Sequence, residues 1–479
     1  MARRARRPVA VLTVLALLPA LGLGALAMFA RSQTDSSSAV ATANTTPVSL
    51  PQPLATGLLS VRRAPTVLTT DRRADVLSAS LAPLADGLDA TSCLAVNVND
   101  VPLVTRNADV QVIPASNVKI ITAAVALDVL GAGATFTTTV VGPAPVNGVV
   151  DGDVYLVGGG DPVLSENWYT QPADGRKRPP LHATDVNALA DALQAAGVTS
   201  ITGSVIGDGS RYDDEHFPPG WSDDIRASAD GTPVGALVIN DSTTRTSGHG
   251  SDPTSSASKT FVSLLDDRGI SVDGGADVGS APAGLSVLGS VTSAPLVDIL
   301  NEMLATSDNL TAEMLVKEIG YMSGVGGTRE AGLQIISDRL TGWGLPMASV
   351  QFTDGSGLSR DNQLTCALLA SVLARGTATD PVGAGLARGG QDGSTLADSF
   401  QQEGMADVLQ GKTGTLSGVK SLSGYYLAGG DEITFVLILN GDATGDFQAR
   451  WDLLATALLS LGETPEPSAL VPAGSAATG

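Results

Sequence analysis

The stretch that decides the fold is Ile113-Pro-Ala-Ser-Asn-Val-Lys-Ile-Ile-Thr-Ala-Ala-Val-Ala-Leu127. Its proline suits the start of a helix, and the apolar residues that follow are arranged as in a buried helix. One helical turn places residues i and i+3 on the same face, so the hydroxyl of Ser116 and the amine of Lys119 are expected side by side. The stretch therefore predicts a buried helix that carries a serine and a lysine at its beginning.

The Ser-x-x-Lys pattern alone is a weak signal here, because three of the six lysines complete one. The pair Ser116/Lys119 differs from the others in its apolar surroundings. Burial lowers the pKa of a lysine, whereas an exposed lysine stays near about 10.4 and is a poor base at neutral pH. The pair ending at Lys259 lies in a polar run, where its serine is expected as a helix N-cap. The pair ending at Lys420 lies at a glycine-flanked turn, expected of a hairpin.

Two further motifs follow in order along the chain. Ser307-Asp-Asn309 precedes a helical pattern, and Lys412-Thr-Gly-Thr415 contains the chain's one Lys-Thr-Gly and opens a predicted strand. The glycine is expected to let a substrate backbone approach the strand edge. The competing Ser165-Glu-Asn167 lies in a loop and is expected to be structural.

A lysine base is favoured over a histidine, since there is no Gly-x-Ser-x-Gly and the three histidines lie in polar, loop-like stretches. Ser-x-x-Lys, Ser-x-Asn and Lys-Thr-Gly in this order are typical of β-lactamases and penicillin-binding proteins.

On these motifs the chain resembles the class C low-molecular-mass penicillin-binding proteins, the D-alanyl-D-alanine carboxypeptidase/endopeptidase family (peptidase S13-like), over about residues 58–460. Four other stretches look like family signatures: Gly158-Gly-Gly-Asp-Pro162, Asp354-Gly-Ser-Gly-Leu-Ser-Arg360, Gly411-Lys-Thr-Gly-Thr-Leu416 and Ser421-Leu-Ser-Gly-Tyr425. The resemblance implies an α/β fold of the penicillin-binding protein/β-lactamase-like transpeptidase type. In that fold an antiparallel sheet is flanked by helices and joined by an all-helical part, here interrupted by an inserted β-rich domain.

The resemblance also implies roles for five residues. Ser116 is expected to attack the carbonyl between two D-alanines, and Lys119 to take its proton. Ser307 is expected to relay a proton to the departing amine with the support of Lys412. Asn309 is expected to orient Lys119 and the substrate amide.

The Lys-Thr-Gly strand is expected to bind the substrate through Thr413, Gly414 and Thr415. The hydroxyls of Thr413 and Thr415 are the expected partners of the terminal carboxylate. The backbone N–H groups of Ser116 and Thr415 are expected to form the oxyanion hole. Water then releases the acyl-enzyme, β-lactams acylate Ser116 as substrate mimics, and no cofactor is needed.

Composition shifts suggest a division of the chain into parts. The expected parts are 1–31, an Arg cluster and transmembrane anchor or signal peptide; 32–60, a flexible linker; 61–140 with 285–460, the catalytic domain; 141–284, the inserted domain; and 461–479, a disordered tail. Residues 8–30 form an uncharged, mostly apolar run long enough to span a bilayer, and an uncleaved anchor is favoured over a cleaved signal peptide. The catalytic part is therefore expected outside the cell membrane. The span between the first two motifs is short for the family, which predicts one well-formed insert domain and a second that is reduced or absent.

Charge and cysteine content limit the partners. The net charge is −21 without a basic cluster beyond the N-terminus, which argues against nucleic acid. The expected partners are peptidoglycan peptides, β-lactams as inhibitors, and a membrane through the N-terminal segment. Two cysteines and three scattered histidines predict no metal site, and Cys93 and Cys366 either pair or remain buried thiols. The alternatives are a β-lactamase-like hydrolase and a non-catalytic cell-wall scaffold on the same fold.

Overall fold

The computed structural model describes residues 66–171, 180–244 and 248–462. The main body is built from elements on both sides of an insertion. These are α2 (Thr66–Asp86), β1 (Cys93–Val98), β2 (Val101–Arg106), η1 (Ala115–Asn117), α3 (Val118–Leu130), α7 (Leu296–Thr306), α8 (Asn309–Met322), α9 (Arg329–Gly342), α10 (Cys366–Leu373), α11 (Pro381–Gly385), β13 (Ala387–Arg388), β14 (Gln410–Leu416), β15 (Val419–Ala428), β16 (Asp431–Asn440), η3 (Gly441–Thr444), α12 (Phe447–Leu459) and η4 (Ser460–Gly462).

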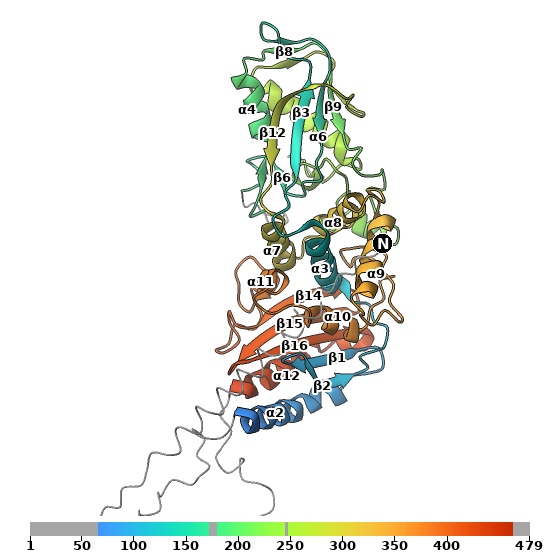
Figure 1. The fold of residues 1–479 in the computed structure, drawn as a ribbon, viewed down its shortest axis with the longest axis vertical. Coiled ribbons are helices and arrows are strands. Elements are labelled where there is room, and N and C mark those ends of the chain that lie inside the picture. The colour runs from blue at the N-terminus through green and yellow to red at the C-terminus, as the bar shows by residue number, and fades with distance from the viewer. Residues whose placement is uncertain (1–65, 172–179, 245–247, 463–479) are drawn as a thin grey trace, which may run out of the picture. The chain divides into compact units, whose positions relative to one another are not determined.

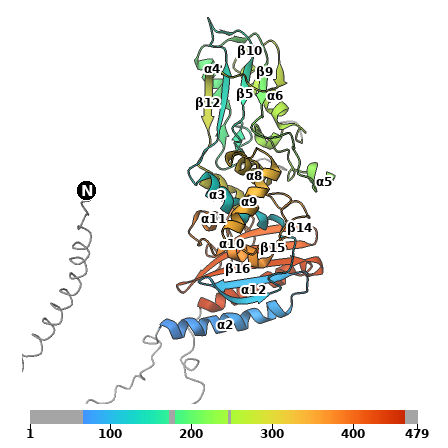
Figure 2. The same ribbon diagram turned by 45° about the vertical axis from the view of Figure 1, so that its right-hand side comes forward.

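The body is organised around one antiparallel sheet of six strands in the order β13-β14-β15-β16-β1-β2. Alternate residues of β16 face opposite sides, because successive side chains of a strand point in opposite directions. Phe435 and Leu437 pack with α2 and α12, whereas Val436 and Ile438 pack with the helices on the other face. Figures 1 and 2 show α2 and α12 below the sheet and α3 above it. Helix α10 packs on the same face of the sheet as α3. The predicted α/β fold class is therefore confirmed.

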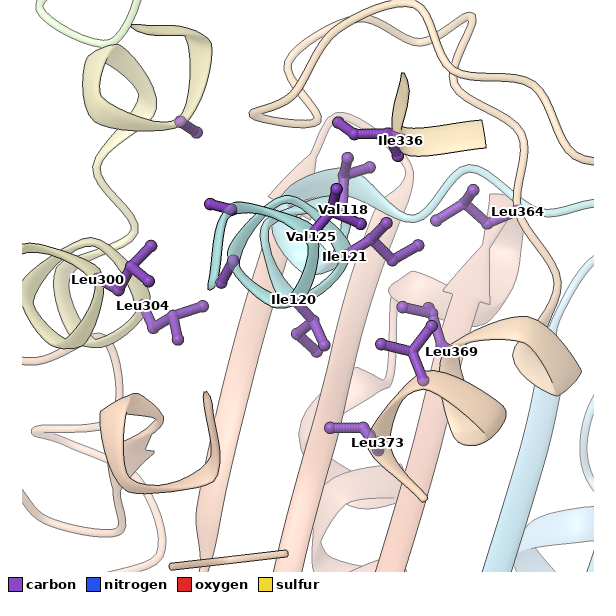
Figure 3. Packing of buried hydrophobic residues seen from close by; sticks show 14 of the residues in the cluster. Val118, Ile120, Ile121, Val125, Leu300, Leu304, Ile336, Leu364, Leu369 and Leu373 are labelled. Atoms are coloured by element: carbon purple, nitrogen blue, oxygen red, sulfur yellow. The ribbon is translucent and has the colours of Figure 1, made fainter. Parts of the chain in front are cut away.

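Helix α3 lies in the centre of the helical part. Figure 3 shows Ile120, Ile121 and Val125 surrounded by apolar side chains from α7, α9 and α10. Such all-round burial explains why the segment is apolar on every face rather than amphipathic. The predicted buried helix is confirmed: Lys119 lies in its first turn, and Ser116 lies in η1, the short 3-10 helix that leads into it.

Cys93 and Cys366 form a disulfide with a Cα–Cα distance of 6.1 Å. It joins the first residue of β1 in the sheet to the first residue of α10 in the helical part. Of the two possibilities left open by the sequence, the structure has the paired one. The bond crosslinks two segments of the body that are 273 positions apart.

The insertion contains a second core of its own. Its elements are β3 (Thr137–Gly142), β4 (Val149–Val150), β5 (Val154–Val157), β6 (Leu164–Ser165), β7 (Thr184–Asp185), α4 (Asn187–Ala195), β8 (Ser200–Ile201), β9 (Val205–Asp208), α5 (Asp223–Arg226), η2 (Asn240–Ser242), α6 (Pro253–Asp266), β10 (Ser271–Val272), β11 (Ala276–Val278) and β12 (Ser286–Thr292). Five strands form one sheet, β11-β9-β5-β3-β12, and three form another, β10-β8-β4. Because β3 and β12 pair with each other, the inserted sheet runs from Thr137 to Thr292, a few residues beyond each expected bound of 141–284.

The expectation that Ser256 is a helix N-cap is wrong. Asp252 caps α6, and Ser256 lies one turn inside the helix with its hydroxyl donating to the Asp252 carbonyl.

No helix in the described part of the chain is long and apolar enough to cross a membrane. The predicted anchor at residues 8–30 lies outside that part.

Candidate active site

The structure brings the serine and lysine of the first motif together with the asparagine of the second. The Nζ of Lys119 lies 3.0 Å from Ser116 Oγ, 2.7 Å from Asn309 Oδ1 and 2.6 Å from the carbonyl oxygen of Ser356. Lys119 is fully buried, with no exposed surface. Two of the three neighbours are acceptors that cannot move far, since one belongs to a buried side chain and one to the backbone.

This arrangement suits an amine that takes a proton from a hydroxyl. A neutral amine has two N–H donors and one lone pair. When the two donors are held by Asn309 Oδ1 and the Ser356 carbonyl, the lone pair of Lys119 faces Ser116 Oγ. The serine O–H then donates to the amine, which is the geometry a general base requires.

The side-chain amide of Asn309 is itself held in place. Its Nδ2 donates to the carbonyl oxygen of Asp230 at 3.0 Å, from a loop of the inserted segment. This bond turns Oδ1 toward Lys119, because the two ends of an amide have opposite hydrogen-bonding character. No sequence pattern indicated Asp230, because the contact is made by its backbone carbonyl.

A buried loop supplies the carbonyl of Ser356, and two carboxyl groups shape it. Asp354 accepts from the N–H groups of Gly357 at 2.7 Å and Ser359 at 2.6 Å. It also accepts from Nε1 of Trp221 at 3.0 Å, so a buried tryptophan of the inserted segment is tied to the loop. These contacts show that Asp354 shapes the backbone of the loop, and that Trp221 is packed against it.

Glu313 is the second carboxyl beneath this loop. It accepts from the N–H of Gly355 at 3.1 Å and of Ser356 at 2.7 Å, and it lies on α8 one turn after Asn309. Burial and the nearby charge of Asp354 raise the pKa of Glu313 to about 8. One face of α8 therefore contributes both the asparagine that contacts Lys119 and the carboxyl that supports the Ser356 carbonyl.

We expect this buried carboxyl to make the stability of the protein depend on pH. The folded state holds a proton on Glu313 up to about pH 8, whereas the unfolded chain releases it near the ordinary value of 4.5. The stabilisation is thus fully present below pH 4.5 and is lost as the pH rises through 8. Glu313→Gln, which keeps an acceptor but cannot ionise, should flatten the fall in Tm between pH 5 and 9. The exposed Glu403→Gln is the matched control, and an unchanged slope in Glu313→Gln would contradict the assignment.

The segment 114–117, which contains Ser116, is fastened to the Lys-Thr-Gly strand. Asn117 donates to the carbonyl of Lys412 at 3.2 Å and to Ser421 Oγ at 2.6 Å, and Ser421 Oγ donates to the carbonyl of Pro114 at 2.8 Å. Ala115 has a φ of 48°, an unusual conformation for a residue with a side chain, immediately before the serine. These contacts fix the position of Ser116 relative to β14.

Gly414 has a packing role in addition to the expected one. A Cβ at this position would collide with Ser421 Oγ and lie 3.0 Å from the carbonyl oxygen of Pro114. The glycine therefore lets β14 approach the segment 114–117 closely. Gly414 also lines the cavity in front of Ser116, so its expected role in letting a substrate backbone approach the strand edge stays a prediction.

The remaining predicted residues are placed around the same site with fewer contacts. Ser307 ends α7 in a left-handed conformation, with a φ of 65°, and lines the cleft, where its hydroxyl makes no hydrogen bond with any described residue. Lys412 is fully buried and its Nζ donates to the Thr413 carbonyl at 2.9 Å. The structure thus contains no hydrogen bond between Ser307 and Lys412 within the described residues.

A cavity of about 650 Å³ opens in front of Ser116. Its lining includes three predicted binders of the strand, Thr413, Gly414 and Thr415. Other residues of the lining were not predicted and carry charges or aromatic rings: Asp230, Asp241, Glu302, Asp308, Lys420, Phe447 and Trp451. The volume suits a short peptide, since binding clefts for small ligands measure roughly 300–1,000 Å³.

One further carboxyl beside the cleft was missed by the sequence reasoning. Asp161 precedes Pro162 and Val163, which line the cavity, and its Oδ2 has no hydrogen-bond partner within the described residues. Burial raises the pKa of Asp161 to about 6. The Gly-Gly-Gly-Asp-Pro stretch was noticed as a family signature, but nothing in it indicated that the aspartate would be buried at the cleft.

Comparison with known proteins gives related chains of similar length. A D-alanyl-D-alanine carboxypeptidase from an Actinomadura species is 28% identical over 471 residues, covering 81% of this chain and 84% of the relative. A carboxypeptidase from Mycobacterium tuberculosis is 30% identical over 383 residues, covering 75% of this chain and 77% of the relative. The crystal structure of penicillin binding protein 4 from Haemophilus influenzae superposes with a TM-score of 0.67 at 19% identity, covering 79% of this chain and 98% of that one. This likeness shows the shared fold.

The family model described as the D-Ala-D-Ala carboxypeptidase 3 (S13) family matches residues 82–250 and 243–458. The match includes all three motifs as well as the inserted segment between the first and the second. Because it covers well over half of the sequence, the chain belongs to the D-Ala-D-Ala carboxypeptidase 3 (S13) family of serine-type carboxypeptidases.

Proposed function

We propose that the protein is a serine-type D-alanyl-D-alanine carboxypeptidase and/or DD-endopeptidase that cuts peptidoglycan stem peptides through an acyl-enzyme on Ser116. The observation that carries the proposal is the buried amine of Lys119, placed between Ser116 Oγ and two fixed acceptors. Few structural roles explain a buried lysine directed at a serine on the wall of a peptide-sized cleft. The family relatives named as carboxypeptidases support the same reaction class.

The reaction follows from the geometry in two stages. In the first stage Ser116 transfers its proton to Lys119, and its oxygen attacks the carbonyl carbon between two D-alanines. The oxyanion is held by the backbone N–H groups of Ser116 and Thr415, a kind of contact worth roughly 3 kcal/mol per donor in other enzymes. The carbon–nitrogen bond then breaks, and the departing amine takes up a proton delivered through Ser307 with the support of Lys412.

In the second stage water attacks the ester carbonyl and restores the serine hydroxyl. Asn309 keeps the lysine and the substrate amide aligned in both stages. The hydroxyls of Thr413 and Thr415 bind the substrate carboxylate at the strand edge. A β-lactam enters the first stage as a substrate mimic, and its acyl-enzyme is released slowly. The protein acts outside the cell membrane, held there by residues 8–30 or secreted if that segment is cleaved.

The full chain should release D-alanine from a peptide ending in D-Ala-D-Ala and leave the peptide ending in D-Ala-L-Ala intact. It should also take up one fluorescent penicillin per chain and keep it for many minutes. D-alanine release is measured by amino-acid analysis, and label retention by gel fluorescence after removal of free antibiotic. A disulfide-linked dimer of two stem peptides that lack D-Ala-D-Ala contains no bond that this chemistry cuts and serves as a negative control.

The other outcomes separate the rival functions. Rapid turnover of penicillin without peptide cleavage would identify a β-lactamase-like hydrolase. Binding to peptidoglycan without cleavage or labelling would identify a cell-wall scaffold. Either outcome would overturn the proposed activity.

A further inference from the structure

Lys420 is a cation of the cleft that the proposed reaction does not use. It lies on β15 directly opposite Thr415 of β14, and both residues line the same cavity as Ser116. Its Nζ is 3.2 Å from Thr415 Oγ1 and 4.4 Å from the centre of the Phe447 ring. Although Ser417 lies in the hairpin turn, as expected, Lys420 belongs to the strand beyond it and faces the cleft.

The contact between Lys420 and Thr415 has a direction. An ammonium group can only donate, so Thr415 Oγ1 accepts from it and the hydroxyl hydrogen of Thr415 is left to donate elsewhere. Within the described residues, the structure gives no acceptor for the hydroxyl of Thr415 or for that of Thr413. The strand edge therefore presents two hydroxyl donors and one ammonium, which together suit an anion.

The charge of Lys420 is held but not neutralised. The Phe447 ring attracts the ammonium through its π face, a contact worth about 0.5–1 kcal/mol at exposed sites. No carboxylate of the described residues forms an ion pair with Lys420. The ammonium is thus positioned at the cleft wall with its charge still available to a ligand.

Other parts of the cleft wall carry carboxylates. Asp230, Asp241 and Glu302 line the side formed by the inserted segment and α7. Repulsion by these carboxylates disfavours an anion there, whereas Lys420 attracts one at the strand edge. The polarity of the cavity therefore favours binding of a peptide with its free carboxylate at the strand edge.

We propose that Lys420, acting with Thr415, forms a subsite for the carboxylate of the leaving amino acid and determines the preference for peptides with a free C-terminus. This inference rests on the proposed function, because it assigns a residue to the leaving side of the same cleft. Lys420 would contact the carboxylate directly or through the Thr415 hydroxyl. Replacing Lys420 should weaken substrate binding more than it slows the chemical step.

The test compares two peptides that end in D-Ala-D-Ala, one with a free carboxylate and one with a C-terminal carboxamide. The parent should prefer the carboxylate. Lys420→Met should lower kcat/KM for the carboxylate peptide about 10- to 100-fold, mainly through KM, because a hydrogen bond to a charged group is lost. The carboxamide peptide should be cleaved at nearly the parent rate, so the preference disappears, and Lys420→Arg should restore most of it.

Controls separate this inference from the proposed function and from simple unfolding. Lys259→Met removes an exposed lysine of α6 and should leave kcat/KM for both peptides unchanged. Lys420→Met should still take up one penicillin per chain at saturating concentration, which reports a folded site. The role of Lys420 would be overturned by either of two results with an active parent. The Lys420→Met variant could keep the preference for the carboxylate peptide, or it could cleave both peptides more slowly by the same factor. A parent that neither cleaves peptide nor binds penicillin would overturn the proposed function instead.

Discussion

Replacing Ser116 by alanine should abolish covalent labelling by penicillin and reduce D-alanine release by about 10³-fold or more, as expected when a nucleophile is removed. The hydroxyl oxygen is the atom that forms the bond to the substrate, and alanine offers no substitute. The fold should persist, because Lys119 retains its contacts to Asn309 and Ser356 when the serine oxygen is lost. Intact-mass analysis after incubation with penicillin measures the label directly, and Tm measures the fold.

Ser256→Ala is the matched control for this experiment. Ser256 also stands three residues before a lysine, but it lies on a helix of the insert and its hydroxyl donates to the carbonyl of Asp252. That variant should bind penicillin as the parent does. A mass increase on Ser116→Ala equal to one penicillin would show that the nucleophile lies elsewhere.

The parts of the site that were predictable from the sequence are those that depend on short spacing. Ser116 and Lys119 are three residues apart, within one helical turn, and the Lys-Thr-Gly strand begins a hairpin whose turn contains Gly418. Local rules of helix and strand geometry are enough to place such side chains on a given face. The order of the motifs then indicated that the chain brings them together, as the structure does for Ser116, Lys119 and Asn309.

The contacts that were not predictable join segments far apart in the chain, often through the backbone. The carbonyl of Ser356 accepts from Lys119 across 237 positions, and the carbonyl of Asp230 accepts from Asn309 across 79. A carbonyl group is present in every residue, so sequence patterns carry no information about which one will be used. Glu313 and Asp354 were also missed, since a buried carboxyl looks like a surface one until its donors are known.

Helix α9 was missed for a related reason. Its polar residues are spread around the helix, and it contains Gly332, which disfavours a helix in the absence of tertiary contacts. In the structure a Cβ at Gly332 would collide with the carbonyl of Val316 on α8. The glycine is thus selected by close packing of two helices, a tertiary effect that overrides local propensity.

Replacing Lys119 should slow acylation by about 10²–10⁴-fold, the range typical of a lost general base. Lys119→Met has nearly the same length but no lone pair, and Lys119→Arg remains charged at any accessible pH, so neither can accept the serine proton. The acylation rate by penicillin is measured from the mass increase with time. Lys259→Arg, at an exposed lysine, is the matched control and should acylate at the parent rate.

The pH dependence distinguishes a base from a structural lysine. If Lys119 accepts the proton, acylation of the parent rises with pH as the amine loses its charge, and Lys119→Met loses that rise together with the rate. A lysine that only supports Asn309 and the Ser356 carbonyl would instead give a lower rate with the same pH profile. A profile unchanged in Lys119→Met would transfer the role of base to another group, and Lys412, buried on the neighbouring strand, would be the first to test.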